Sequence, residues 1–198
     1  SNLKSAGLES VEVSLQAPGE HNVRNALATL AIVDVLGLSR EQAAKALSKF
    51  TGTGRRFDLR GEANGVSVFD DYAHHPTEIK ATLAGARARY PERRIWAVWQ
   101  PHTYSRTQAL YLEFSRAFKD ADEVIVTEVY AAREPKQEFT SAEIVSGMPH
   151  PSARYLATLP QVTDYLLKNL HPNDVLIVLS AGDADQICAD VLKALKER

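Results

Sequence analysis

From residue 66 onward, short apolar runs alternate with segments whose apolar residues recur at helical spacing. Several runs are continuously apolar, which is typical of parallel strands covered on both faces. The expected strands are 66–70, 95–99, 123–129, 153–157 and 175–180. The expected helices are 77–90, 106–119, 141–147, 161–170 and 184–197. This alternation predicts an α/β fold with a doubly wound, mostly parallel sheet, built from about 140 residues.

The first fifty residues follow a different pattern. Residues 11–15 alternate like a strand, and a turn at Pro18-Gly19 leads into an expected helix over 22–36. This helix is apolar on nearly all sides, which is typical of a helix buried inside a domain. A second helix is expected over 39–50, because the spacing of Ser39 and Gln42 resembles a capping box.

The small-residue segment 51–54, Thr-Gly-Thr-Gly, indicates a domain boundary, and we expect it to act as a hinge. One strand and two helices cannot enclose the apolar helix that precedes it. We therefore expect residues 1–53 to be the tail of one domain and residues 54–198 to form a complete second domain.

The densest polar segment lies where the first of the alternating strands meets its helix. Seven of its nine side chains can accept, donate or transfer a proton; it reads Asp70-Asp71-Tyr72-Ala73-His74-His75-Pro76-Thr77-Glu78. Pro76 suits a first helical position, so the segment is expected between the carboxyl end of a strand and the amino end of a helix. Sheets of this class place ligands there, and free backbone N–H groups attract anions.

Three further polar clusters accompany this segment. One follows the strand that ends at Trp99 and reads Gln100-Pro101-His102-Thr103-Tyr104-Ser105-Arg106-Thr107. If both strands are parallel, this loop faces the same sheet edge as the first segment. The others are His21-Asn22-x-x-Asn25, which opens the apolar helix, and Arg55-Arg56, which follows the expected hinge.

Composition excludes several classes of partner. A net charge of −2 provides no basic surface for nucleic acid and no attraction to an anionic membrane. The single cysteine, Cys188, excludes an internal disulfide framework and favours a reducing, cytoplasmic setting. No apolar run approaches the roughly 20 residues needed to cross a bilayer.

Two functions remain open from the residues alone. The acids and histidines of 70–78 are usual ligands of zinc or manganese and would suit a metal-dependent hydrolase, although no second cluster with ligand spacing follows. A non-catalytic nucleotide-binding module is the other alternative, because no Gly-x-x-x-x-Gly-Lys-Ser/Thr loop occurs in the chain.

Four segments together resemble the Mur ligases of peptidoglycan synthesis, in the family's order and spacing over essentially the whole chain. They are Gly19-x-His21-Asn22-x-x-Asn25-Ala26, Gly54-Arg55-Arg56-Phe57, the 70–78 segment and the 100–107 segment. The last of these favours the branch that adds L-alanine to UDP-N-acetylmuramate. The related ligase that recycles murein tripeptide shares a similar aspartate–histidine motif and is not expected to carry the 100–107 segment.

The resemblance implies a cytoplasmic, three-domain ligase. ATP with Mg²⁺ phosphorylates the carboxylate of UDP-N-acetylmuramate, and the amine of L-alanine attacks the acyl phosphate. Residues 1–53 would then be the tail of the central ATP-binding domain, and residues 54–198 the Rossmann-like C-terminal domain. The phosphate-binding loop is absent, so the Mg²⁺ ligands are expected elsewhere in the parent protein, and no residue of this chain is assigned as a metal ligand. This chain alone is therefore expected to be inactive.

The resemblance also implies roles for individual residues on the nucleotide side. His21, Asn22 and Asn25 would contact the nucleotide, and the side-chain amides of Asn22 and Asn25 can read the edge of adenine. For Asn22, a simple helix cap is the alternative. Arg56 would neutralise the phosphoryl group during transfer, with a solvated surface arginine as the alternative. Asp71 would orient the ribose or the phosphate region.

Free L-alanine presents a carboxylate and an amine. The planar fork of Arg106 matches a carboxylate, and the resemblance implies that His74 and Arg106 contact the amino acid, with His102 and His75 as further candidates. His74 is also a candidate catalytic residue together with Arg56 and Asp71. Some relatives place a second arginine where this chain has Thr103. One of the groups expected to bind the carboxylate of L-alanine is therefore different here.

Other polar residues have ordinary explanations. Asp70 is expected to be a solvated acid at the strand end, and Glu78 an acid of the first helical turn. Residues 180–183 either line the site through backbone amides or form a strand-to-helix turn that needs glycine. Cys188 is expected to pack in the core.

Overall fold

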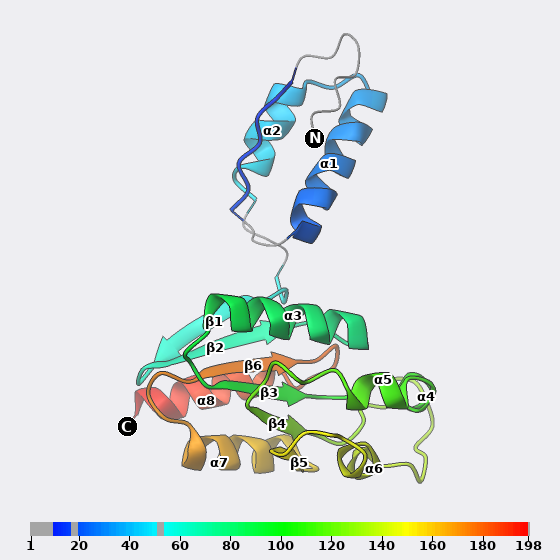
Figure 1. Cartoon of the computed structure of the whole chain (residues 1–198), viewed down its shortest axis with the longest axis vertical. Helices are drawn as coiled ribbons and strands as arrows, with labels where there is room; N and C mark the ends of the chain where they lie inside the picture. The colour runs from blue at the N-terminus through cyan, green and yellow to red at the C-terminus, as the bar shows by residue number, and fades with distance from the viewer. Residues whose placement is uncertain (1–9, 17–19, 51–53, 198) are drawn as a thin grey trace. The chain divides into compact units, whose positions relative to one another are not determined.

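The computed structural model describes residues 10–16, 20–50 and 54–197. The chain divides into two compact units, Ser1–Thr53 and Gly54–Arg198, and each is described here by itself (Figure 1). The expected turn at Pro18-Gly19 and most of the expected hinge at 51–54 lie outside the described residues. Among the described residues, no helix is long and apolar enough to cross a membrane.

The described part of the first unit contains two helices, α1 (Glu20–Val35) and α2 (Arg40–Leu47). The cap predicted at Ser39 is present, since the Gln42 amide donates to the Ser39 side chain at 3.2 Å. The prediction of a strand over 11–15 is wrong. These residues pair with no strand among the described residues, and an alternating pattern forms a strand only where a neighbour completes the hydrogen-bond ladder.

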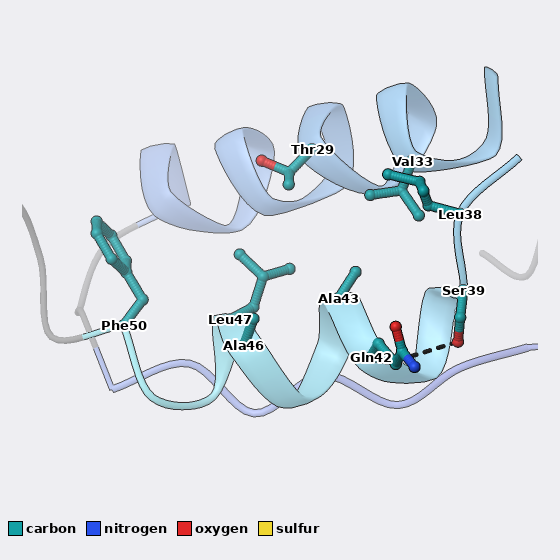
Figure 2. Close-up of a pocket in the computed structure, with 9 residues that line it drawn as sticks. All are labelled: Thr29, Val33, Leu38, Ser39, Gln42, Ala43, Ala46, Leu47 and Phe50. Carbon is teal, nitrogen blue, oxygen red and sulfur yellow. Dashed lines mark hydrogen bonds between the residues drawn. The ribbon is translucent and has the colours of Figure 1, made fainter. Parts of the chain in front are cut away.

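Much of the apolar surface of the first unit is exposed. Of the larger side chains on α1, Leu27 is 62%, Ile32 59% and Val35 86% exposed. A groove of about 470 Å³ separates α1 from α2, and Figure 2 shows its nine lining side chains, which are mostly apolar and carry no charge: Thr29, Val33, Leu38, Ser39, Gln42, Ala43, Ala46, Leu47 and Phe50. The described part of the unit thus leaves exposed much of the apolar surface of the helix that the sequence predicts to lie inside a domain.

The second unit is built on a six-stranded sheet in the order β1-β2-β6-β3-β4-β5. The strands are β1 (Asp58–Ala63), β2 (Val66–Asp71), β3 (Ile95–Trp99), β4 (Glu123–Val126), β5 (Ala153–Tyr155) and β6 (Val175–Leu179). All pairs are parallel except β1 with β2. Every residue of β2, β3 and β6 is buried, which confirms the expected doubly wound, mostly parallel sheet.

Helices cover both faces of this sheet. They are α3 (Pro76–Arg89), α4 (Tyr104–Ala109), α5 (Tyr111–Ser115), α6 (Ser141–Ser146), α7 (Leu159–Asn169) and α8 (Gln186–Lys196). One apolar cluster joins α3, α5 and α6 to one face, and a second joins α7 and α8 to the other. Cys188 lies in the second cluster, as expected, and burial raises its thiol pKa to about 12.

The single helix expected over 106–119 is instead two short helices, α4 and α5, that meet at Leu110. Leu110 and Phe114 pack in the same apolar cluster as the sheet. The apolar spacing therefore continues across the break, which is why the pattern could not reveal it.

Strand β6 lies between β2 and β3, although it is last in the chain. The carboxyl ends of β2, β6 and β3 consequently lie side by side, and the loop after β6 is flanked by the two polar loops that follow β2 and β3. The two loops share one sheet edge, as expected, with the end of β6 between them. We call this the carboxyl edge.

Candidate active site at the carboxyl edge of the sheet

Part of the 70–78 segment is used to start helix α3. His75 is the N-cap and Pro76 the first helical residue. The Glu78 carboxylate accepts hydrogen bonds from the backbone N–H groups of His74 (3.0 Å) and His75 (3.2 Å), which completes a capping box. The interpretation of Glu78 as a first-turn acid is confirmed, and His75 is engaged in the cap.

Asp71 is buried and joins three segments of the chain. One carboxylate oxygen accepts from the Ala73 amide at 2.7 Å. The other accepts from the Phe57 amide at 2.8 Å and the Thr82 hydroxyl at 3.2 Å. Burial raises the pKa of Asp71, while these hydrogen bonds oppose the rise. Because protein donors occupy both oxygens, the geometry suits Asp71 to positioning the loop of Phe57 against β2 and α3.

Asp70 is not the solvated strand-end acid that the sequence suggests. It is fully buried, because β1 covers the outer edge of β2 and pairs Asp58 with Asp70. The Arg55 guanidinium donates to Asp70 at 2.9 Å and to the Ser180 carbonyl at 2.9 Å. Arg55 therefore holds the first residues of the second unit against β2 and against the end of β6.

Arg56 remains available at the surface, since half of its side chain is exposed. Its Nη1 lies 3.5 Å from the Glu78 carboxylate, and its guanidinium lies 5.9 Å from the centre of the Tyr72 ring. The residues on either side, Arg55 and Phe57, both have positive φ (59° and 48°). Such left-handed backbone persists in non-glycine residues where surrounding contacts hold it, so Arg56 projects from a fixed segment.

The loop after β3 is locked to the loop after β6 through Gln100. The Gln100 amide oxygen accepts from the Ser180 hydroxyl (2.8 Å) and the Ala184 amide (3.2 Å), and its nitrogen donates to Asp183 (2.7 Å). A Cβ at Gly182 would lie 2.5 Å from the Gln100 oxygen. Glycine is therefore required here by close approach of side chains.

The structure brings His74 and His102 together, with ring centres 6.3 Å apart. Tyr72, to which the sequence assigned no role, packs edge-on against His74 at 5.4 Å. Burial lowers the pKa of His102, and the charges of Arg106 and His74 lower it further, while the charge of Glu134 opposes the shift. Among the described residues, His102 Nδ1 and Arg106 Nη1 are shielded from solvent and have no hydrogen-bond partner. These two unpaired groups suit an anionic ligand such as a carboxylate.

We expect His102 to titrate below the ordinary histidine value of 6.5. NMR titration of its ring resonances measures this pKa directly. Arg106→Ala should raise the midpoint toward 6.5, because one positive neighbour is removed while burial remains. The surface change Arg116→Ala should leave it unchanged, and a midpoint at or above 6.5 in the unaltered chain would contradict the geometry.

The sign of the associated stability effect follows from the same shift. The unfolded chain takes up the His102 proton at a higher pH than the folded chain does. The contribution of His102 to stability is therefore complete above about pH 6.5 and is lost as the pH falls through the folded-state pKa.

The expected nucleotide residues His21, Asn22 and Asn25 lie in α1 of the first unit, whereas the other candidates lie in the second. Helix α1 begins at Glu20, so Asn22 is its third residue. The Asn25 side chain is exposed.

The part of the chain that the structure describes offers no group of residues that fits a magnesium or zinc site. Within 10–16, 20–50 and 54–197, no three His, Cys, Asp or Glu side chains cluster as metal ligands. Asp70 is paired with Arg55, and Glu78 caps α3. This geometry lends no support to the metal-dependent hydrolase.

Comparison with known proteins adds independent information. A curated relative, the UDP-N-acetylmuramate--L-alanine ligase of Acetivibrio thermocellus, is 45% identical over 185 residues, covering 91% of this chain and 39% of that protein. The ligase of the same name from Roseiflexus sp. is 43% identical over 186 residues, covering 93% and 40%. The chain thus spans about two fifths of the length of these relatives.

Two solved structures are similar in fold over nearly the whole chain. The UDP-N-acetylmuramate-alanine ligase of Thermotoga maritima has a TM-score of 0.76 at 30% identity, covering 96% of this chain and 41% of that one. A murein peptide ligase of Psychrobacter arcticus has a TM-score of 0.74 at 29% identity, covering 94% and 39%. The family model described as "Mur ligase, glutamate ligase domain" matches residues 55–182, and the chain therefore belongs to the Mur ligase family.

Proposed function

We propose that this chain is the carboxyl-terminal part of a cytoplasmic, ATP-dependent ligase that joins L-alanine to UDP-N-acetylmuramate in peptidoglycan synthesis. The observation that carries the proposal is the group at the carboxyl edge, where the His74 and His102 rings lie 6.3 Å apart and His102 and Arg106 each have a nitrogen without a hydrogen-bond partner among the described residues. The names of the curated relatives support the same reaction.

In this reaction, ATP supplies the phosphoryl group that activates the sugar carboxylate, and the incoming amine displaces phosphate to form the amide. The guanidinium of Arg106 binds the carboxylate of L-alanine, while His102 and His74 orient the amino acid toward the acyl carbon. The half-exposed Arg56 neutralises phosphoryl charge as it develops. Asp71 acts by fixing the Phe57 loop, and hence the segment that carries Arg56.

In the parent protein, residues 1–53 would form the tail of the central ATP-binding domain, with His21, Asn22 and Asn25 near the nucleotide. The exposed apolar side chains of α1 support this assignment, because they require a covering that the described part of the unit does not supply. Residues 54–198 would form the C-terminal domain. The phosphate-binding loop and the Mg²⁺ ligands would belong to the rest of the parent, so this chain alone would be inactive.

The murein-peptide recycling ligase is the second candidate. A structure of that class is almost as similar in fold as the alanine-adding ligase, with TM-scores of 0.74 and 0.76. The fold therefore does not separate the two reactions, and the 100–107 segment is the feature that favours L-alanine as acceptor.

We expect the full-length parent to release phosphate from ATP only when UDP-N-acetylmuramate and L-alanine are both present. The measurement is phosphate release with L-alanine, with murein tripeptide, and with no acceptor, together with mass detection of the joined product. Release with the tripeptide but not with L-alanine would assign the protein to the recycling class instead.

A further inference from the structure

The segment that follows β4 crosses the loop that carries His102 and Arg106. The Tyr130 amide donates to the Pro101 carbonyl at 2.8 Å, and the Thr103 amide donates to the Tyr130 carbonyl at 2.9 Å. These two bonds form a short parallel bridge between His102 and Tyr130. The backbone on both sides of His102 is thus fixed by one residue from another loop.

The Tyr130 side chain reinforces this bridge. Its ring stacks on the His102 ring, with centres 5.7 Å apart and an angle of 26° between the planes. The ring also approaches Gly182 so closely that a Cβ there would lie 2.7 Å from Tyr130 Cγ. The Tyr130 ring therefore fixes the orientation of the His102 imidazole. The loop after β6 in turn fixes the position of the Tyr130 ring.

A second contact lies four residues further along the same segment. The Glu134 carboxylate accepts hydrogen bonds from the Ser105 amide at 3.1 Å and from the Ser105 hydroxyl. Both bonds lower the pKa of Glu134, so the group is charged at neutral pH. Ser105 directly precedes Arg106, and this contact fixes the backbone from which the guanidinium extends.

The loop needs such support because its backbone is strained. Thr103, between His102 and Arg106, has φ 67°, which a β-branched residue rarely adopts. Its carbonyl accepts from the Thr107 hydroxyl at 2.6 Å, and its amide is held by Tyr130. Strained backbone of this kind persists only where neighbouring contacts hold it.

We propose that Tyr130 and Glu134 are positioning residues for the amino-acid site, which hold His102 and Arg106 in the orientation that grips the carboxylate of L-alanine. The inference rests on the proposed function. Neither residue is placed in contact with the amino acid. Tyr130 acts through the His102 ring and the backbone beside it, and Glu134 acts through Ser105.

The test uses the full-length parent ligase with Tyr130→Ala and Glu134→Ala. Each change should raise the KM for L-alanine between about 10- and 100-fold, because misplacement by an ångström has effects of this size. The KM for ATP should be unchanged. Tyr130→Phe, which keeps the ring, should restore most of the affinity. Glu134→Gln should restore part of it, because glutamine keeps one acceptor oxygen for Ser105 and replaces the other by an NH2 donor.

Matched controls separate positioning from stability. Tyr165 lies on α7, and its ring packs against the ring of Trp96. Glu138 is an exposed acid four residues after Glu134. Tyr165→Ala and Glu138→Ala should leave the KM for L-alanine unchanged, even where Tyr165→Ala lowers the melting temperature. If the control variants raise the KM for L-alanine as much as Tyr130→Ala and Glu134→Ala do, the effect is general destabilisation and the inference is wrong.

A second readout uses the 198-residue chain without ligand. The His102 ring resonances should shift in Tyr130→Ala and Glu134→Ala and stay in place in Glu138→Ala. Arg106→Ala provides the reference: if it raises the KM for L-alanine while Tyr130→Ala and Glu134→Ala do not, the positioning role is wrong and the proposed function stands. If Arg106→Ala has no effect on that KM, the amino-acid site itself is wrong, and the positioning role falls with it.

Discussion

Replacing Arg106 by alanine in the full-length parent is expected to raise the KM for L-alanine about 10- to 150-fold, with little change in the KM for ATP. The range corresponds to roughly 1.5 to 3 kcal/mol for a hydrogen bond to a charged group. Arg106 Nη1 is shielded from solvent and unpaired in the described structure, so a carboxylate would provide the partner that it lacks. Steady-state kinetics with each substrate varied in turn measures the effect.

Two variants control this experiment. Arg106→Lys keeps the charge but loses the bidentate fork, so it should recover only part of the affinity. Arg116→Ala removes an exposed arginine from the end of α5 and should change neither KM. Unchanged saturation by L-alanine in Arg106→Ala would show that the 100–107 loop does not form the amino-acid pocket.

The centre of the sheet could be predicted because β3 and β6 are continuous apolar runs. Strand β3 occupies the predicted residues, and β2 and β6 differ from prediction by one residue each. The sequence did not predict strand β1, since Asp58–Ala63 contains two acids, an arginine and a glycine, and three of its six residues are exposed. An antiparallel edge strand needs no apolar run, because one neighbour supplies its ladder.

The order of the strands could not be predicted, because periodicity carries no information about which distant strands pair. The position of β6 between β2 and β3 is what links Ser180 both to Gln100 and to Arg55. From the sequence, Gly182 looks like a turn residue. The structure shows that Gln100 and Tyr130 leave no room for a side chain there.

Adjacent residues of the same type were the hardest to separate. Arg55 and Arg56 look equivalent in the sequence, as do Asp70 and Asp71. The structure pairs Arg55 with the fully buried Asp70 and leaves Arg56 half exposed. By contrast, the proximity of His74 and His102 could be expected, because both follow parallel strands at one edge.

Arg56→Ala in the full-length parent is expected to lower kcat roughly 10²- to 10³-fold while changing the KM for L-alanine little. Phosphoryl charge develops mainly in the transition state, and loss of one group that stabilises such charge has effects of this size. The contacts of Arg56 with Glu78 and Tyr72 are long, at 3.5 Å and 5.9 Å, and its side chain is half exposed. Its removal should therefore cost little stability, and a melting curve should overlay that of the unaltered protein.

Arg89 offers a matched control for this experiment. Its guanidinium lies 5.4 Å from the centre of the Tyr90 ring, much as that of Arg56 lies over Tyr72, but it belongs to the last turn of α3. Arg89→Ala should leave kcat unchanged. Arg56 projects from a backbone that Asp71 and Asp70 hold in place. Arg56→Lys should restore only part of the rate, because lysine supplies a point charge without the planar fork of the guanidinium. If Arg56→Ala lowered affinity for L-alanine and spared kcat, Arg56 would belong to the amino-acid pocket rather than to phosphoryl transfer.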